Sequence, residues 1–176
     1  MVTIRIATKD DASSIQKIYE PYVLNTTITF ELEPPTVKEM AQRIEHTLEK
    51  YPYLVAEEDG KVIGYAYAGT LYDRRAYDHS AELSIYVDQN KRRGGIGHLL
   101  YNALIRYLEK MNITNLYCCI TYPNPASISF HEKYGFKEAA HFHECGYKFD
   151  QWLDVVYLEK KLPKTTEPFK LFKEIC

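Results

Sequence analysis

The sequence predicts a mixed α/β fold in which helices pack on the faces of a mixed sheet. Its 176 residues suit a single domain, long enough to bury a core without a disulfide or a metal. Segments with strand-like alternation are interleaved with segments of helical periodicity, in the order β-α-α-β-β-β-α-β-α-β-β. We therefore expect one domain over residues 1–162, followed by a polar and charged tail over 163–176.

The first half of the chain carries clear start and turn signals. Asp10 and Asp11 open a first helix, and Thr36 with Glu39 forms the capping box of a second helix after a proline pair. Asp59-Gly60 predicts a tight hairpin turn. The expected helices are 10–24 and 36–50, the expected strands are 2–7, 53–57, 62–69 and 81–88, and 26–30 is rich in β-branched residues and predicts a short extended segment.

The second half begins with the longest predicted helix, 95–111, whose apolar residues recur at helical spacing. These are Ile96, Leu99, Leu100, Ala103, Leu104, Leu108 and Met111. Further strands are expected at 116–121, 136–143 and 152–159, with a helix at 126–134. In the tail, Phe169, Leu171 and Phe172 are the expected apolar anchors.

Composition limits the classes of partner. Lys and Arg number 22 against 24 Asp and Glu, so the net charge of −2 argues against nucleic acid or an anionic membrane as the main partner. No apolar run approaches the roughly 20 residues of a membrane span, and the N-terminus does not resemble a signal peptide, so we expect the cytoplasm. The cysteines form no CxxC pair, and Cys118 and Cys119 are expected to be buried thiols.

The most informative stretch is IYVDQNKRRGGIGHLL, residues 85–100, where a strand leads through basic residues into a glycine-rich helix start. Glycines expose backbone N–H groups, and a helix N-terminus adds about half a positive charge, which together make a pyrophosphate cradle. The P-loop pattern is absent, and Leu100 stands where a dinucleotide fingerprint needs its third glycine. The pattern that fits is RxxGxG at Arg92, Gly95 and Gly97. Taken alone, it could also be a glycine turn with solvated charges.

This RxxGxG pattern resembles the pyrophosphate loop of the GCN5-related N-acetyltransferases. Asn124 begins NPASISFHEKYGF, which resembles that family's second acetyl-CoA signature. The resemblance implies a mostly antiparallel central sheet with helices on both faces and acetyl-CoA as cosubstrate. It also implies a set of cofactor-binding residues, namely Ile85, Tyr86, Val87, Arg92, Arg93, Gly94, Gly95, Ile96, Gly97 and Asn124.

The chain departs from the general family pattern at His131, where many members have tyrosine. One branch, the phosphinothricin and methionine sulfoximine N-acetyltransferases, has histidine there. That branch is also similar in RRAYDHSAELSIYV (74–87), in TTITFELEPPT (26–36) and in GYKFDQWLDVVYLEKKL (146–162). The resemblance implies a small amino-acid-like amine as acceptor and a homodimer.

The branch resemblance implies roles for five side chains. Glu82 would take the amine proton, directly or through water, and His131 would donate to the departing sulfur or orient the substrate. Phe30, Arg74 and Tyr77 would form the acceptor side, with Arg74 pairing a carboxylate or phosphinate. Ordinary structural roles remain open for each: a surface salt bridge, a helix hydrogen bond, core aromatics and a solvated loop arginine.

A backbone N–H near Val87 would polarise the thioester oxygen. No Cys or Ser lies in a recognisable nucleophile motif, which agrees with direct transfer. His141, His143 and Cys145 alternate in a metal-like way, but we expect solvated side chains and no metal. Acetylation of a protein or peptide N-terminus and non-catalytic binding of acyl-CoA are the competing functions.

Overall fold

The computed structural model describes residues 1–91 and 94–176. Its element order and its mixed, mostly antiparallel sheet confirm the predicted fold class. The strands are β1 (Val2–Ile6), β2 (Tyr53–Glu58), β3 (Lys61–Thr70), β4 (Ser80–Val87), β5 (Asn115–Tyr122), β6 (Lys137–Lys148) and β7 (Gln151–Lys161). The α-helices are α1 (Ala12–Asn25), α2 (Val37–Leu48), α3 (Ile96–Lys110) and α4 (Pro125–Lys133), and the short 3-10 helices are η1 (Lys9–Asp11), η2 (Arg75–Tyr77), η3 (Gln89–Lys91) and η4 (Phe172–Glu174).

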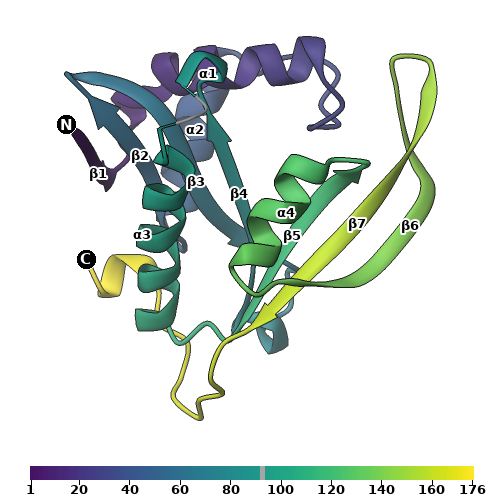
Figure 1. The fold of residues 1–176 in the computed structure, drawn as a ribbon. Helices are drawn as coiled ribbons and strands as arrows, with labels where there is room; N and C mark the ends of the chain where they lie inside the picture. The colour runs from purple at the N-terminus through teal and green to yellow at the C-terminus, as the bar shows by residue number, and fades with distance from the viewer. Residues whose placement is uncertain (92–93) are drawn as a thin grey trace.

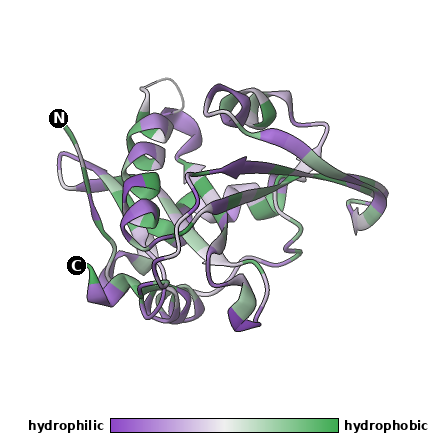
Figure 2. Ribbon diagram, turned by 90° about the horizontal axis from the view of Figure 1, so that it is seen from below, coloured by the Kyte–Doolittle hydropathy of each residue, from purple (hydrophilic) through white to green (hydrophobic). Residues whose placement is uncertain are grey.

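The sheet order is β1-β2-β3-β4-β5-β7-β6, with β4 and β5 as its parallel pair. In Figure 1, α3 and α4 lie in front of the sheet and α1 and α2 lie behind it. A hydrophobic core lies on each face of the sheet, and successive side chains of β2 point alternately into the two cores. Leu54 and Ala56 pack with α3, whereas Tyr53 and Val55 pack with α1 and α2. Figure 2 shows hydrophobic and hydrophilic bands alternating along the helices, as expected when one helix face is buried.

The predicted local signals form as expected. Thr36 Oγ1 accepts from the Glu39 amide at 3.2 Å, and the Glu39 carboxylate accepts from the Thr36 amide at 2.7 Å, so the capping box starts α2. Asp59 and Gly60 both have positive φ, 51° and 75°, in the hairpin turn between β2 and β3. A β-branched residue would be strained at either position.

Three expectations differ from the structure. Residues 26–30 form an irregular segment rather than a strand, because side chains from other elements, not a neighbouring strand, hold its carbonyls. Leu99 is 44% exposed because it lies on the outer side of α3. Cys119 is exposed while Cys118 is buried, since adjacent residues of β5 point to opposite faces of the sheet.

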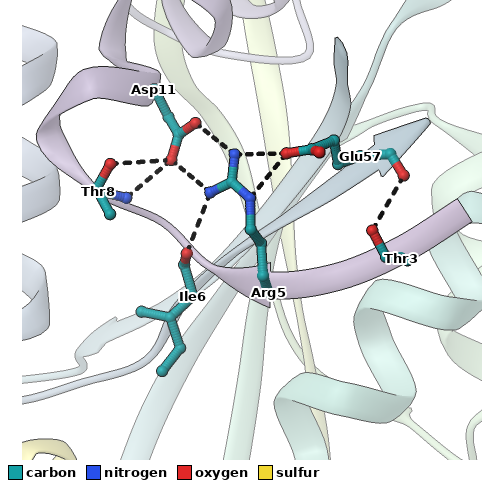
Figure 3. A network of polar contacts seen from close by, with 6 residues as sticks. All are labelled: Thr3, Arg5, Ile6, Thr8, Asp11 and Glu57. Atoms are coloured by element: carbon teal, nitrogen blue, oxygen red, sulfur yellow. Dashed lines mark hydrogen bonds and ion pairs between the residues drawn. The ribbon is translucent and has the colours of Figure 1, made fainter. Parts of the chain in front are cut away.

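Arg5 ties the N-terminal edge of the sheet together (Figure 3). Its guanidinium donates two 2.8 Å hydrogen bonds to Asp11 and one of 2.8 Å to Glu57, joining β1 to η1 and β2. Hydrogen bonding to Arg5 lowers the pKa of Asp11 although that carboxylate is buried. Arg5, Asp11 and Glu57 therefore form an ion-pair network that joins β1, η1 and β2.

The C-terminal tail packs against the rest of the chain. Phe172 is 2% exposed, its ring lies 5.2 Å from that of Tyr107, and its amide donates to the Lys50 carbonyl at 3.1 Å. Phe169 also contacts the core, where its ring lies 6.3 Å from Tyr51. Among the helices of the described residues, none has the length and apolar character needed to cross a membrane.

Candidate active site

A gap opens in the sheet between β4 and β5. The two strands pair only from Ser80↔Asn115 to Glu82↔Tyr117, and beyond that point they diverge (Figure 1). On the other edge of β4, the Asp88 amide donates to the Ile63 carbonyl at 2.9 Å, which sets the alternation of the β3–β4 ladder. The N–H groups of Ile85 and Val87 therefore face away from β3 and toward the gap, where the sequence predicts a backbone N–H for the thioester oxygen.

A cavity lies in this gap and brings together residues from distant parts of the chain. Four predicted site residues line it, namely Ile85, Tyr86, Asn124 and His131. Its other lining residues are Ile28, Leu83, Ser84, Cys118, Cys119, Ile120 and Ser127. The cavity thus joins β4, β5, α4 and the segment that follows α1.

The glycine loop starts α3 beside this cavity. Gly95 is the N-cap and has φ of 70°, a left-handed conformation that favours glycine. At Gly97, an added Cβ would lie 3.5 Å from Phe130, an ordinary contact. Arg92 and Arg93 lie outside the described residues. Lys91 pairs with Glu58 at 2.8 Å, so the charge of Lys91 is partly neutralised.

Asn124 caps α4, because its Oδ1 accepts from the Ser127 amide at 3.2 Å. The cap engages the side-chain oxygen and leaves the amide NH2 group as the donor available to a ligand in the cavity. Helix capping and ligand binding are therefore compatible at this residue. Ser127 was not anticipated as part of the site; its position three residues after the cap is the signal that could have indicated it.

His131 is 4% exposed and lies against the rings of Tyr101, Phe130 and Phe136. Its Nδ1 lies 2.8 Å from the Ser127 carbonyl. A carbonyl only accepts, so Nδ1 carries the hydrogen and Nε2 is the acceptor of the neutral ring. Burial lowers the pKa of His131, which keeps the ring neutral.

Glu82 occupies the last paired position before the gap opens. Burial raises the pKa of its carboxyl, and no cation compensates within the part of the chain that the structure describes, where no hydrogen bond or ion pair reaches this carboxylate. Its charge also contributes to the raised pKa of Cys119, Tyr157 and Tyr67, although burial is the larger cause in each case. Glu82 is thus a desolvated carboxylate among polarisable and phenolic neighbours.

Of the predicted acceptor-side residues, Phe30 is packed against β6, whereas Arg74 and Tyr77 are exposed on a loop. Phe30 packs so closely on Gly146 of β6 that any side chain at position 146 would overlap its ring. Arg74 and Tyr77 lie on the β3–β4 loop, where Arg74 is exposed and Tyr77 is 39% exposed with its ring 4.9 Å from that of Tyr72. None of the three predicted acceptor-side residues lines the cavity.

Tyr22 is a residue that the sequence did not single out for the site. Its hydroxyl donates to the Val87 carbonyl at 2.6 Å, linking α1 to the end of β4. In the sequence it was indistinguishable from a helix residue facing the core, which it also is. The long-range bond becomes visible only once the helix is packed on the sheet.

His141 and His143 do share a face, as predicted, but their partner is Asp154 rather than Cys145. Both rings donate to Asp154 Oδ2, at 2.8 and 2.9 Å, and the Glu144 amide donates to Oδ1 at 2.8 Å. These bonds, that of Glu144 foremost, lower the pKa of Asp154 to about 2. A bulge between Phe142 and Gly146 breaks the alternation that would have placed Cys145 with the two histidines.

Comparison with known proteins settles the family. Residues 4–157 match the family described as Acetyltransferase (GNAT) domain. The chain belongs to the GNAT acetyltransferase family. The GNAT resemblance seen in the glycine loop and the Asn124 signature is therefore confirmed.

Named relatives lie in the branch that His131 indicated. A phosphinothricin N-acetyltransferase of Streptomyces viridochromogenes is 34% identical over 176 residues, covering 99% of this chain and 96% of that protein. An L-methionine sulfoximine/L-methionine sulfone acetyltransferase of Salmonella typhimurium is 32% identical over 168 residues, covering 95% and 98%. A crystal structure of a GNAT superfamily phosphinothricin acetyltransferase from Sinorhizobium meliloti, in complex with AcCoA, superposes with a TM-score of 0.90 at 34% identity, covering 97% and 98%.

Proposed function

We propose that this GNAT protein transfers the acetyl group of acetyl-CoA to the α-amine of a small amino-acid-like acceptor, such as phosphinothricin or methionine sulfoximine. The observation that carries the proposal is the gap between β4 and β5, which has main-chain groups of β4 along one edge, Glu82 at its apex and His131 in its wall. The named activities of the relatives support the choice of donor and of acceptor class.

The donor side would bind acetyl-CoA at three places. The left-handed turn at Gly95 exposes N–H groups at the start of α3 for the pyrophosphate. The amide NH2 of Asn124 would donate to the pantetheine arm, and the edge of β4 would pair with the same arm. A main-chain N–H of Ile85 or Val87 would donate to the thioester oxygen, where negative charge develops.

The chemical step would be direct attack of the amine on the thioester carbon. The C–N bond forms, the C–S bond breaks and the electron pair leaves with the sulfur. The second proton lost by the nitrogen goes to the departing thiolate, which gives free CoA. Glu82 accepts the ammonium proton, directly or through a water, and its raised pKa makes the carboxylate a stronger base. His131, neutral with Nδ1–H held by Ser127, offers an acceptor at Nε2 and so orients a donor rather than supplying a proton.

Thiol release from acetyl-CoA, followed on purified protein with a panel of amines, tests the reaction and its acceptor. Free amino acids and their sulfoximine or phosphinic analogues should outperform peptides and aminoglycosides. Better turnover with peptides would favour protein or peptide N-terminal acetylation instead. Binding of acyl-CoA without release for any amine would favour a non-catalytic acyl-CoA-binding role.

The acceptor's carboxylate should matter if Arg74 pairs with it. Arg74 is exposed on its loop, so the pairing would require the loop to approach the bound acceptor. Arg74→Ala should then mostly raise KM, and blocking the substrate carboxylate as an amide should weaken it by about 100-fold if the pair is buried. Arg75→Ala, on the same exposed loop, is the matched control, and equal effects of the two variants would remove Arg74 from the site.

The donor site can be tested without turnover. Gly95→Glu should abolish CoA binding measured by calorimetry, because its side chain would occupy and repel the pyrophosphate site, and because φ of 70° is strained for glutamate. Gly60→Glu, also at positive φ but in the distant β2–β3 turn, controls for backbone strain. Unchanged CoA affinity in folded Gly95→Glu would contradict the donor site.

We also propose that the protein is a homodimer. Aromatic side chains on β6, β7 and their turn are at least half exposed, a density that favours association. They are Phe142 (50%), Tyr147 (54%), Phe149 (52%) and Trp152 (63%). Light scattering should give twice the monomer mass, and Trp152→Lys should shift it toward the monomer.

A further inference from the structure

We propose that Lys148 is a positioning residue that fixes the acceptor-side wall of the active site. The wall is the irregular segment 27–30, whose Ile28 lines the cavity and whose Phe30 packs on Gly146. That this wall faces the acceptor rests on the proposed function, but the placement of the wall can be measured independently of that function.

The position of Lys148 is unusual for a lysine. Its side chain belongs to β6, is 2% exposed and donates to the carbonyls of Val23 at 2.7 Å and Thr29 at 2.8 Å. No ion pair to Lys148 occurs among the residues that the structure describes, whereas the ammonium groups of Lys50 and Lys91 each pair with a carboxylate. Burying an ammonium without a carboxylate costs free energy, and burial accordingly lowers the pKa of Lys148.

The two carbonyls that Lys148 binds show which segments its buried ammonium holds together. Val23 lies in the last turn of α1, and Thr29 lies inside the wall. One ammonium therefore fixes the exit of the helix and the segment after it to the same strand. Because helix ends and loops have carbonyls without partners in the backbone, a buried donor is an effective way to hold them.

Further contacts hold the wall from other sides. Thr121 Oγ1 on β5 donates to the Thr27 carbonyl at 2.6 Å, and the hydroxyls of Tyr19 and Thr29 are 2.7 Å apart. Residues from α1, β5 and β6 thus converge on four consecutive residues that make no strand of their own. Side chains from these three elements hold the wall, and Lys148 supplies the bond to the Thr29 carbonyl while the same ammonium binds the Val23 carbonyl of α1.

Lys148 should affect binding of the acceptor and not binding of acetyl-CoA. The wall borders the cavity at Ile28, whereas Asn124, Gly95 and β4 are not bound by Lys148. Loss of the Lys148 bonds should therefore change how the acceptor is held and leave the donor site intact. A misplacement of about 1 Å away from the reacting atoms can cost roughly 100-fold in rate, so the effect should be measurable.

The test compares Lys148→Met, which keeps the aliphatic stem and removes the donors, with Lys137→Met, an exposed position on the same strand. With methionine sulfoximine as probe, Lys148→Met should raise the acceptor KM by roughly 10-fold to 100-fold and leave the KM of acetyl-CoA within about threefold. Hydrogen exchange should accelerate in peptides covering 24–33 and stay unchanged in those covering α3. Lys137→Met should behave as the unmodified protein in all three measurements.

Folded Lys148→Met with an unchanged acceptor KM and unchanged exchange at 24–33 would overturn the inference. Equal increases in both KM values would also overturn it, because they would indicate a general structural role. If Lys148→Met does not fold, Gly146→Ala displaces the Phe30 ring without removing a buried donor, and an unchanged acceptor KM there would contradict the wall. Exchange requires no turnover, so failure of the proposed acetylation and failure of the Lys148 inference give different results.

Discussion

Asp11 is a buried carboxylate and Glu82 a partly buried one, and their surroundings move their pKa values in opposite directions. Asp11 accepts two 2.8 Å bonds from Arg5, and this contact lowers its pKa despite burial. Glu82 has no such cation among the described residues, so burial alone raises its pKa. The presence of a partner, rather than burial itself, separates a carboxylate that holds the sheet edge together from one suited to accept a proton.

The gap itself shows a second contrast, between Glu82 on β4 and His131 on α4. Desolvation favours the neutral form of both groups, so it raises the pKa of the carboxyl and lowers that of the imidazole. Glu82 gains basicity, whereas His131 loses its ability to serve as a cationic acid at neutral pH. The same physical cause therefore assigns the two residues different roles.

The largest expected effect is on turnover. Glu82→Gln should lower kcat by roughly 10²–10⁴-fold, the usual range for a lost general base, and leave CoA affinity unchanged in calorimetry. The loss should shrink as pH rises, because more of the acceptor amine is then already neutral. Glu138→Gln, exposed on β6, is the matched control. Near-normal turnover of Glu82→Gln at pH 7 would show that the carboxylate is structural.

A smaller effect should separate the two roles proposed for His131. In His131→Asn the amide can still donate toward the Ser127 carbonyl, but the acceptor corresponding to Nε2 is lost, and we expect kcat to fall by about 10-fold. If His131 acts as a neutral acceptor, activity of the unmodified protein should fall as acid protonates the ring. If it acts as the acid, activity should instead fall as pH rises through its pKa, and the acceptor role would be wrong.

The sequence predicted the fold better than the placement of the site. Periodicity, the Thr36 capping box and the Asp59-Gly60 turn are local signals, and each formed as expected. The bonds from Lys148 to Thr29 and from Tyr22 to Val87 join residues 119 and 65 positions apart, and no local pattern encodes them. The prediction of an extended segment at 26–30 is wrong for the same reason, since β-branched residues favour a strand only when a neighbouring strand is available to pair with them.

The smallest expected effect is a difference in how stability depends on pH. Glu82 has a folded pKa above its unfolded value near 4.5, so the folded state binds more protons between these two values and stability declines as pH rises through them. His131 has a folded pKa below its unfolded value near 6.5, so stability declines as pH falls from 6.5 through the folded pKa. A tenfold difference in proton affinity between the folded and unfolded states corresponds to about 1.4 kcal/mol of stability.

Urea unfolding at a series of pH values should therefore give opposite slopes for the two variants relative to the unmodified protein. Glu82→Gln should gain relative stability as pH rises from 4 toward 7, because the cost of burying the carboxylate is gone, and the gain should vanish near pH 4. His131→Asn should be less stable than the unmodified protein at every pH because it loses packing. As pH falls below 6.5, however, the stability of the variant should decline less than that of the unmodified protein. Parallel pH profiles for both variants would mean that the two groups are solvated in the folded state, and the contrast between Glu82 and His131 would then have no basis in desolvation.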